Sequence, residues 1–307
     1  MKGRESAAER ATRRDWFGLE TFRPGPRFLR AGARCYLLEE VGSTSDFLLG
    51  RGAAAVGRRA DWDGWGWRAQ SLQRLSPVDD PRVGDLVASR RQTAGRGRLG
   101  RRWFDCGGLQ VSSVVPNRRA DFVHGFSVWL GLMVVWSLRE DHELDAMLKW
   151  PNDVLVGGRK LGGLLVDRVG GEERGLVVAG LGLNLSAGPA DFPAELQGRT
   201  TSMRLETGRV PRPAEVIGPI LRTIDRWLGT FAHRGWGPFR TLLADCDVLA
   251  GRWVALDVAG GRVTGKVAGI DHQGALVVAV GGSERRYHAG EVHLVAQPVD
   301  SSGTDRS

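Results

Sequence analysis

Cysteine is scarce in this 307-residue sequence, and its scarcity excludes two kinds of site. The three cysteines, Cys35, Cys106 and Cys246, are odd in number, lie far apart and form no CxxC spacing. This pattern argues against a disulfide framework and against a zinc site. It suits a reducing compartment, so we expect a cytoplasmic protein.

Long apolar runs are also absent. The most apolar stretch, FSVWLGLMVVWSL at 126–138, is shorter than the roughly 20 residues that a membrane-spanning helix needs. The basic N-terminus has no apolar core of the kind found in secretory signals. Because residues 126–138 are apolar on every side, we expect a helix that is fully buried in a protein core.

Negative charge is low where positive charge is concentrated. Residues 51–119 hold fourteen arginines against six aspartates, a net charge of +8, which is the net charge of the whole chain. Such a basic region points to a phosphate-bearing partner, either nucleic acid or a nucleotide. Within it, RRQTAGRGRLGRRW at 90–103 combines six arginines with three glycines. We expect this arginine loop (residues 92–103) to be mobile over 93–102 until a ligand orders it, because like charges repel and glycine raises the entropy cost of ordering.

The rest of the pattern predicts an α+β fold with two globular parts. Residues 1–24 are predicted to be a frayed arm and residues 25–246 a large domain, with a surface insertion at 51–82. Short β segments separated by glycine predict a small barrel over 247–298, followed by a polar tail at 299–307. Apolar periodicity predicts the following strands and helices: strands at 35–41, 85–91, 109–115, 153–167 (a hairpin) and 175–185, and helices at 42–49, 126–138, 214–231 and 236–246.

Several of the predicted strands end in unusual polar stretches. These are KWPND at 149–153, RKLGG at 159–163 and GLGLN at 180–184, and the arginine loop itself closes on Trp103. Strand ends of this kind can converge on one pocket, where a tryptophan can stack a nucleotide base. Proteins that bind duplex DNA usually present a helix. The pattern therefore favours a nucleotide pocket, with a nucleic-acid-binding loop as the alternative.

In combination, these motifs resemble those of the biotin protein ligases, the enzymes that attach biotin to carrier proteins. The resemblance covers residues 35–297 in the same order. It implies an α+β catalytic domain with the mixed, antiparallel sheet of the biotin/lipoate ligase type, followed by an SH3-like barrel. The matching motifs are GSTS at 42–45, QTAGRGRLGRRW at 92–103, KWPND at 149–153, KLGGLL at 160–165 and GLGLN at 180–184.

The resemblance implies a ligase that works in two steps. Biotin and ATP, with Mg²⁺, give biotinyl-5′-AMP and pyrophosphate, and a lysine of a biotin carboxyl carrier protein then attacks the mixed anhydride. Fixed cations suit this chemistry because the attacking carboxylate and the triphosphate repel each other, and arginine offers bidentate contacts to both. The catalytic residues implied are Lys160 beside the reacting carbonyl and phosphate, Arg98, and Asp153, which orients the incoming amine or a Mg²⁺-bound water.

The resemblance also implies two sets of binding residues and no protein metal ligand. The biotin set consists of short hydroxyls, an amide, glycines and cations: Ser43, Thr44, Ser45, Gln92, Gly95, Arg96, Gly97, Arg98, Ser112, Lys160 and Gly163. The ATP set consists of cations, amides and one aromatic ring: Arg96, Arg98, Arg101, Trp103, Asn152, Lys160 and Asn184.

Simpler structural roles are available for some of these residues. Ser43 or Thr44 is also a good helix cap, and Lys160 is also read as an exposed hairpin lysine. Asn152 and Asp153 follow a proline, where Asx hydrogen bonds often stabilise a turn. One position departs from the family, because Ser45 stands where its members usually have asparagine.

Two further features bear on function. The insertion at 51–82 is longer than the resemblance leads us to expect. Only some 34 residues precede the first predicted strand, with no two-helix pattern, so we expect a monofunctional ligase that does not bind DNA or a membrane. The oligomeric state is open, with a homodimer as one form. Two alternatives remain: a lipoate-type ligase on the same scaffold, and a nucleic-acid-binding regulator without catalysis.

Overall fold

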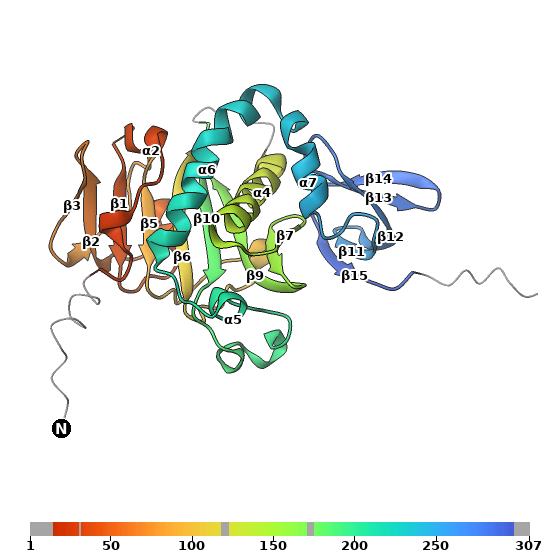
Figure 1. The fold of residues 1–307 in the computed structure, drawn as a ribbon, viewed down its shortest axis with the longest axis horizontal. Coiled ribbons are helices and arrows are strands. Elements are labelled where there is room, and N and C mark those ends of the chain that lie inside the picture. Colours follow the sequence, from red (N-terminus) through yellow and green to blue (C-terminus); the bar gives the residue numbers. More distant parts are fainter. Residues whose placement is uncertain (1–14, 31, 118–122, 171–174, 298–307) are drawn as a thin grey trace, which may run out of the picture.

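The computed structural model describes residues 15–30, 32–117, 123–170 and 175–297 (Figure 1). Ten strands form one mixed sheet, and five strands near the C-terminus form a second, antiparallel sheet. This arrangement confirms the predicted α+β fold with a small C-terminal β domain.

The larger sheet has the strand order β3-β2-β1-β5-β6-β10-β9-β8-β7, and β4 also pairs with β2. β1 and β5 run parallel, whereas the other neighbouring pairs are antiparallel. The strands are β1 (Arg34–Leu38), β2 (Ala55–Trp62), β3 (Trp67–Ala69), β4 (Gln73–Leu75), β5 (Leu86–Ser89), β6 (Gly108–Pro116), β7 (Ala146–Lys149), β8 (Asp153–Val156), β9 (Arg159–Arg168) and β10 (Leu176–Asn184).

Two long helices lie against one face of this sheet (Figure 1). The helices of the described residues are α2 (Pro26–Arg30), α3 (Thr44–Leu48), α4 (Val123–His142), α5 (Met203–Thr207), α6 (Pro213–Arg234) and α7 (Arg240–Cys246). α4 contains the apolar run, and within 126–138 every residue is buried except Trp136, which is partly exposed, as the sequence predicts for a buried helix.

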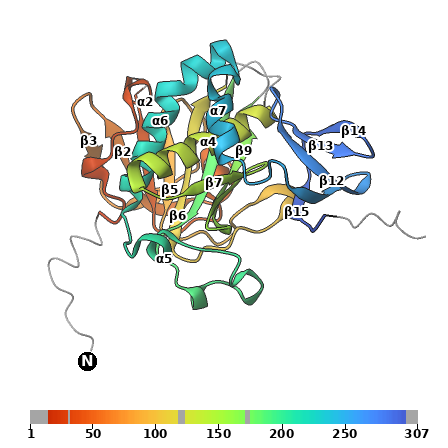
Figure 2. The same cartoon turned by 45° about the vertical axis from the view of Figure 1, so that its right-hand side comes forward.

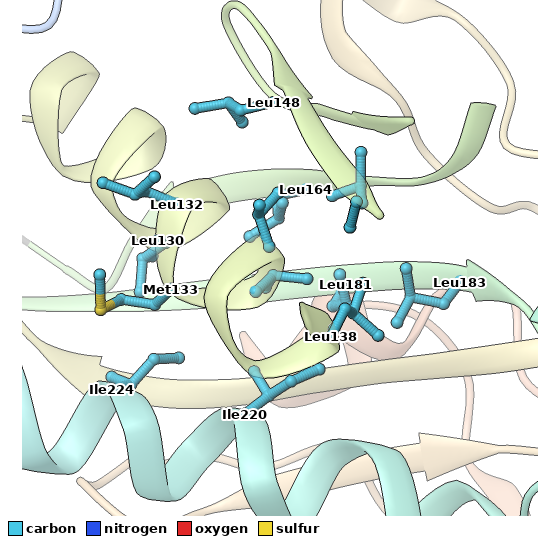
Figure 3. Close-up of a cluster of buried hydrophobic side chains, with 14 of the residues drawn as sticks. Leu130, Leu132, Met133, Leu138, Leu148, Leu164, Leu181, Leu183, Ile220 and Ile224 are labelled. Atoms are coloured by element: carbon cyan, nitrogen blue, oxygen red, sulfur yellow. The ribbon is translucent and has the colours of Figure 1, made fainter. Parts of the chain in front are cut away.

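Most of α4 is buried because the sheet covers one side and α6 another. Figure 3 shows Leu130 and Met133 of α4 near Ile220 and Ile224 of α6, with Leu181 of β10 in the same cluster. A helix that is apolar all round is stable in water only when neighbouring elements cover every side in this way. The packing leaves the opposite face of the sheet for the short helix α3.

On that opposite face, α3 packs its Phe47 and Leu48 against Tyr36 and Leu38 of β1. Ser43 caps this helix, because its side-chain oxygen accepts a hydrogen bond from the Asp46 amide at 3.3 Å. The cap fixes the start of α3, and with it the hydroxyl-bearing GSTS motif, close to the ends of the central strands.

The insertion at 51–82 forms β2, β3 and β4 at one edge of the large sheet. Trp67 of the insertion stacks on Phe22, with ring centroids 5.5 Å apart, and donates its indole N–H to the Phe22 carbonyl oxygen at 2.8 Å. Trp65, at the turn between β2 and β3, is 90% exposed. The insertion therefore extends the sheet and covers the N-terminal segment.

The frayed arm predicted for residues 1–24 is wrong for residues 15–24. Phe17 and Phe22 are buried in the main core, and their rings pack edge to face at 5.1 Å. The segment is rich in charge, which is typical of a solvated arm, but Phe17 and Phe22 belong to the main core, and Phe22 packs on Trp67 of the insertion. Residues 1–14 and the tail at 299–307 lie outside the described residues.

The C-terminal domain has the strand order β14-β13-β12-β11-β15 and lies beside α7 (Figure 2). Its contact with the large domain includes a hydrogen bond from the indole N–H of Trp150, in the KWPND motif, to the carbonyl oxygen of Gly274 at 2.9 Å. Its strands are β11 (Trp253–Val258), β12 (Gly261–Ile270), β13 (Leu276–Val280), β14 (Ser283–Tyr287) and β15 (Glu291–Leu294).

Asp247, which joins α7 to the C-terminal domain, makes stability depend on pH. Burial raises the pKa of its carboxyl from 3.8 to about 6, although the Leu249 amide donates a hydrogen bond to it. The folded state therefore holds a proton that the unfolded state has lost, and stability falls as pH rises from about 4 to about 6. We expect Asp247→Asn to be more stable than the wild type by about 2–3 kcal/mol above pH 6, with no difference near pH 4. Urea unfolding of both proteins across this range measures the difference, and a difference that does not change with pH would contradict it.

Candidate active site

The polar strand ends and the arginine loop enclose a cavity of about 430 Å³, within the size range of sites for small ligands. The structure brings fourteen of the sixteen site residues predicted from the sequence to its wall. They are Ser43, Thr44, Ser45, Gln92, Arg96, Gly97, Arg98, Arg101, Trp103, Asn152, Asp153, Lys160, Gly163 and Asn184. Their individual roles stay predictions.

The other two predicted residues lie directly behind the wall. The Ser112 hydroxyl is fully buried and hydrogen-bonds the hydroxyls of Thr44 at 2.8 Å and Ser45 at 2.9 Å. Gly95 lines an adjoining hollow, and a Cβ at this position would lie 2.7 Å from the carbonyl oxygen of Trp103. Ser112 therefore supports the hydroxyl cluster, and Gly95 allows the two sides of the arginine loop to approach each other.

One end of the cavity is polar and uncharged. The Gln92 side-chain oxygen accepts hydrogen bonds from the backbone N–H of Thr44 at 2.7 Å and from its hydroxyl at 3.1 Å. Because Ser43 is the helix cap, the Thr44 hydroxyl is left to this network, which continues through Ser112 to Ser45. Hydroxyls and an amide can reorient to pair with a neutral ligand that carries both donors and acceptors.

The other end of the cavity is aromatic. Trp103 packs on the backbone of Gly182, where a Cβ would lie 2.5 Å from the indole ring, so only glycine leaves the ring in this place. Phe104 and Phe192 extend the apolar wall, and the Asn184 amide donates a hydrogen bond to the Thr201 carbonyl oxygen at 2.9 Å. A flat, apolar wall with a polar rim is suited to an aromatic base.

A cation with an acidic partner lies beside the aromatic end. Lys160 forms an ion pair with Asp153, with 2.6 Å between Nζ and Oδ1, and its Nζ lies 5.9 Å from the centre of the Trp103 ring. A Cβ at Gly163 would lie 3.2 Å from the same Asp153 oxygen, so glycine leaves room for this pair. Lys160 is therefore a cavity residue with a defined partner, in contrast to the alternative of a solvated hairpin lysine.

Arg98 is a second half-buried cation of the site. Burial lowers the pKa of its guanidinium, nearby Arg101 lowers it further, and Asp153 opposes the shift. Among the described residues its side chain has no ion pair or hydrogen bond, whereas that of Arg101 is paired with Glu291 of the C-terminal domain at 2.5 Å. A desolvated, unpaired guanidinium facing a cavity is well placed to bind an anion.

The arginine loop has a hairpin-like fold. The backbone N–H of Ala94 donates to the Gly42 carbonyl oxygen at 2.8 Å, and that of Gly97 to the Arg101 carbonyl oxygen at 2.7 Å. Leu99, at the tip, has a φ of 55° and is 68% exposed. These bonds give the loop one folded shape, and the mobility expected from its charge and glycine content stays a prediction.

The turn that follows Pro151 is held from across the sheet. The Asn152 amide donates a hydrogen bond to the carbonyl oxygen of Leu164 on β9, at 2.5 Å. The alternative of a local Asx turn is therefore wrong for this side chain, because its partner lies twelve residues away. Asn152 positions the KWPND motif against β9, which carries Lys160.

Sequence reasoning missed several residues of the cavity wall. Phe192, Leu196 and Thr200 come from the segment between β10 and α5, and the half-buried Cys106 lies just after the arginine loop. In the sequence, Phe192 and Leu196 are isolated apolar residues in a polar stretch with no periodicity, so no local signal marks them. They reach the cavity only through the tertiary fold.

The described residues contain neither a membrane-spanning helix nor a cluster of metal-binding side chains. Within them, every helix is too short or too polar to cross a membrane. The same residues contain no group of three or more His, Cys, Asp or Glu side chains that could hold a metal ion.

A mixed sheet whose cavity joins a neutral polar end, a group of cations and an aromatic end has the parts that an acyl-adenylate-forming ligase requires. The family comparisons agree with that class. The model of the biotin/lipoate A/B protein ligase family matches residues 67–184, and that of the biotin protein ligase C-terminal domain matches residues 251–295. The chain belongs to the biotin protein ligase family.

Individual relatives support this assignment. A biotin–[acetyl-CoA-carboxylase] ligase of Mycobacterium tuberculosis is 31% identical over 224 residues, which are 69% of this chain and 79% of that protein. The corresponding ligase of Paracoccus denitrificans is 30% identical over 199 residues, or 62% of this chain and 82% of that protein. A bifunctional ligase/repressor of Bacillus subtilis is 28% identical over 69% of this chain, which spans 66% of that relative's length, just under two thirds.

Solved structures show the same fold. A biotin protein ligase from Aquifex aeolicus, in complex with biotin and ATP, superposes with a TM-score of 0.67 at 26% identity. The match covers 86% of this chain and 99% of that one. The resemblance to the family that the motifs indicate is therefore confirmed at the level of the whole fold.

Proposed function

We propose that this protein is an ATP-dependent biotin ligase, which activates biotin as biotinyl-5′-AMP and transfers it to a lysine of a biotin carboxyl carrier protein. The observation that carries the proposal is that one cavity gathers neutral hydroxyls and an amide, the cations Lys160 and Arg98, and the indole ring of Trp103. The relatives named as biotin–[acetyl-CoA-carboxylase] ligases support it.

In the first step, a carboxylate oxygen of biotin attacks the α-phosphorus of ATP, and the bond to pyrophosphate breaks. The two reactants are both anionic, so fixed positive charge must hold them together and stabilise the charge that grows during the attack. Lys160 and Arg98 line the same cavity as the hydroxyl cluster and Trp103, so they can contact the carboxyl of one ligand and the phosphate of the other. The ureido ring of biotin fits the neutral hydroxyl cluster, and adenine fits the wall formed by Trp103.

In the second step, a neutral lysine amine of the carrier attacks the carbonyl carbon of the anhydride, and AMP leaves. Asp153 forms an ion pair with Lys160, with 2.6 Å between Oδ1 and Nζ, so its carboxylate lies beside the reacting group. It can orient the incoming amine and accept its proton. Lys160 stabilises the departing phosphate in this step as well.

Mg²⁺ fits this site as a companion of ATP. Magnesium is usually bound by one or two carboxylates together with substrate phosphates and water. Asp153 offers such a carboxylate, and the described residues hold no three-ligand cluster. Bound there, the ion would neutralise phosphate charge. We also propose a cytoplasmic location, since the substrate is ATP and all three cysteines are free.

Biotin-dependent exchange of labelled pyrophosphate into ATP tests the proposed function. We expect exchange with biotin and none with lipoate, which is the matched control for the other ligase on this scaffold. Exchange with lipoate alone would identify a lipoate-type ligase. Absence of exchange with either acid, together with nucleic-acid binding that falls steeply with salt, would support the regulator alternative and overturn the proposal.

A further inference from the structure

One arginine of the arginine loop is held by two acids from two other elements. Arg96 forms an ion pair through Nη1 with Asp46 of α3 at 2.6 Å and through Nη2 with Asp167 of β9 at 3.3 Å. All three side chains are partly buried: Arg96 is 36% exposed, Asp46 27% and Asp167 22%. The two nitrogens of one guanidinium therefore bridge two carboxylates across the loop.

The two acids belong to the elements that carry the rest of the site. α3 begins directly after Ser43 and carries the hydroxyls of Thr44 and Ser45. β9 carries Lys160 and Gly163. The Arg96 bridge therefore ties the arginine loop to two elements of the cavity wall, α3 and β9.

The ion pair with Arg96 compensates the negative charge of Asp167. Its second oxygen, Oδ2, is buried and has no hydrogen-bond partner among the described residues. If Arg96 moved away, this half-buried carboxylate would lose its ion pair while its buried oxygen still lacked a partner, which is less favourable than breaking a fully solvated pair. An anionic ligand that recruited Arg96 would likewise leave two acids unpaired. Arg98, which has no such partner in the described part of the chain, is free of this penalty.

We propose that Asp46 and Asp167 are positioning residues that latch the arginine loop shut through Arg96 and so set the lifetime of the bound ligand. The two arginines then have different roles: Arg96 holds the loop closed, and Arg98 contacts the phosphate. This revises the direct role in binding that the sequence suggested for Arg96. The effect on ligand lifetime rests on the proposed function, whereas the latch itself does not.

Amide hydrogen exchange of the protein without ligands tests the latch alone. We expect Asp46→Asn and Asp167→Asn each to raise the exchange rate across 93–102 about threefold to fivefold, because partly exposed ion pairs contribute modestly, and the double variant to raise it further. Glu40→Gln is the matched control, since Glu40 pairs with Arg91 just before the loop at 3.2 Å and is 54% exposed. Unchanged exchange in both Asp variants, or an equal rise in Glu40→Gln, would overturn the proposal.

A second measurement separates a latch from a general structural role. In the Arg96→Ala background, Asp46→Asn and Asp167→Asn should produce no further change in loop exchange, because their partner is already gone. Effects that persist there would mean that the acids act through α3 or β9, and would refute the latch. In the wild-type background, the Asp variants should release biotin about fivefold faster and leave carrier labelling from saturating biotin nearly unchanged. A protein with the exchange pattern but without biotin binding would refute the proposed function and keep the latch.

Discussion

Replacing Lys160 with methionine will abolish biotin-dependent ATP–pyrophosphate exchange and leave the fold intact. Lys160 is the cavity cation that pairs with Asp153 beside Trp103. Removing one preorganised electrostatic contact of this kind costs roughly 3–4 kcal/mol in the transition state, a loss of at least about a hundredfold in rate. Methionine keeps most of the length and the apolar stem of lysine, so the packing beside Trp103 should survive.

The matched control for this variant is Lys266→Met. Lys266 lies on β12 of the C-terminal domain, and its side chain is exposed, so the same chemical change there should leave exchange activity and thermal unfolding unaltered. Initial exchange rates at saturating biotin and ATP are compared for the three proteins. Near-wild-type exchange in Lys160→Met would show that another cation stabilises the reacting phosphate.

The parts of the site that lie on continuous motifs could be predicted from the sequence. GSTS, the arginine loop, KWPND and GLGLN each end a predicted strand or begin a predicted helix, and the structure brings them to one cavity. The buried helix was predictable for a similar reason, since an apolar run that lacks a polar face can only be covered on all sides. The local sequence pattern was sufficient to predict a feature wherever a single continuous segment forms that feature.

Features built from distant segments could not be predicted in this way. Arg96 lies 50 residues from Asp46 and 71 from Asp167, and nothing in the spacing or type of these residues indicates that they meet. Phe192 is an isolated apolar residue in a polar stretch, and it gains its role only when the segment after β10 folds over the cavity.

The prediction for the N-terminal segment was wrong for a different reason. Its charged residues suggested a solvated arm, but Phe17 and Phe22 are buried. Phe22 gains its cover from Trp67, which lies 45 residues away in the insertion. Composition describes a segment on average, whereas burial is decided by single side chains that find a partner elsewhere in the chain.

Arg98 and Arg96 have different roles in the proposed latch, although only one residue lies between them. Arg98 has no ion pair in the described part of the chain, and burial lowers the pKa of its guanidinium. A bound anion would therefore compensate a positive charge that has lost part of its hydration. Arg96 already has two carboxylates. Changes at these two positions should therefore affect different states of the enzyme.

Arg98→Ala should leave the exchange of 93–102 unchanged without ligand, yet release biotinyl-5′-AMP into solution about ten to a hundred times faster, since one charge-assisted contact contributes about 1.5–3 kcal/mol. The escaping anhydride acylates lysines of other proteins, so labelling of a bystander protein by biotin and ATP measures the release. Arg91→Ala is the control, because Arg91 is 71% exposed and pairs with Glu40 outside the cavity. Equal bystander labelling by Arg98→Ala and the wild type would show that the adenylate is held without Arg98, and would assign the phosphate contact to another cation of the cavity.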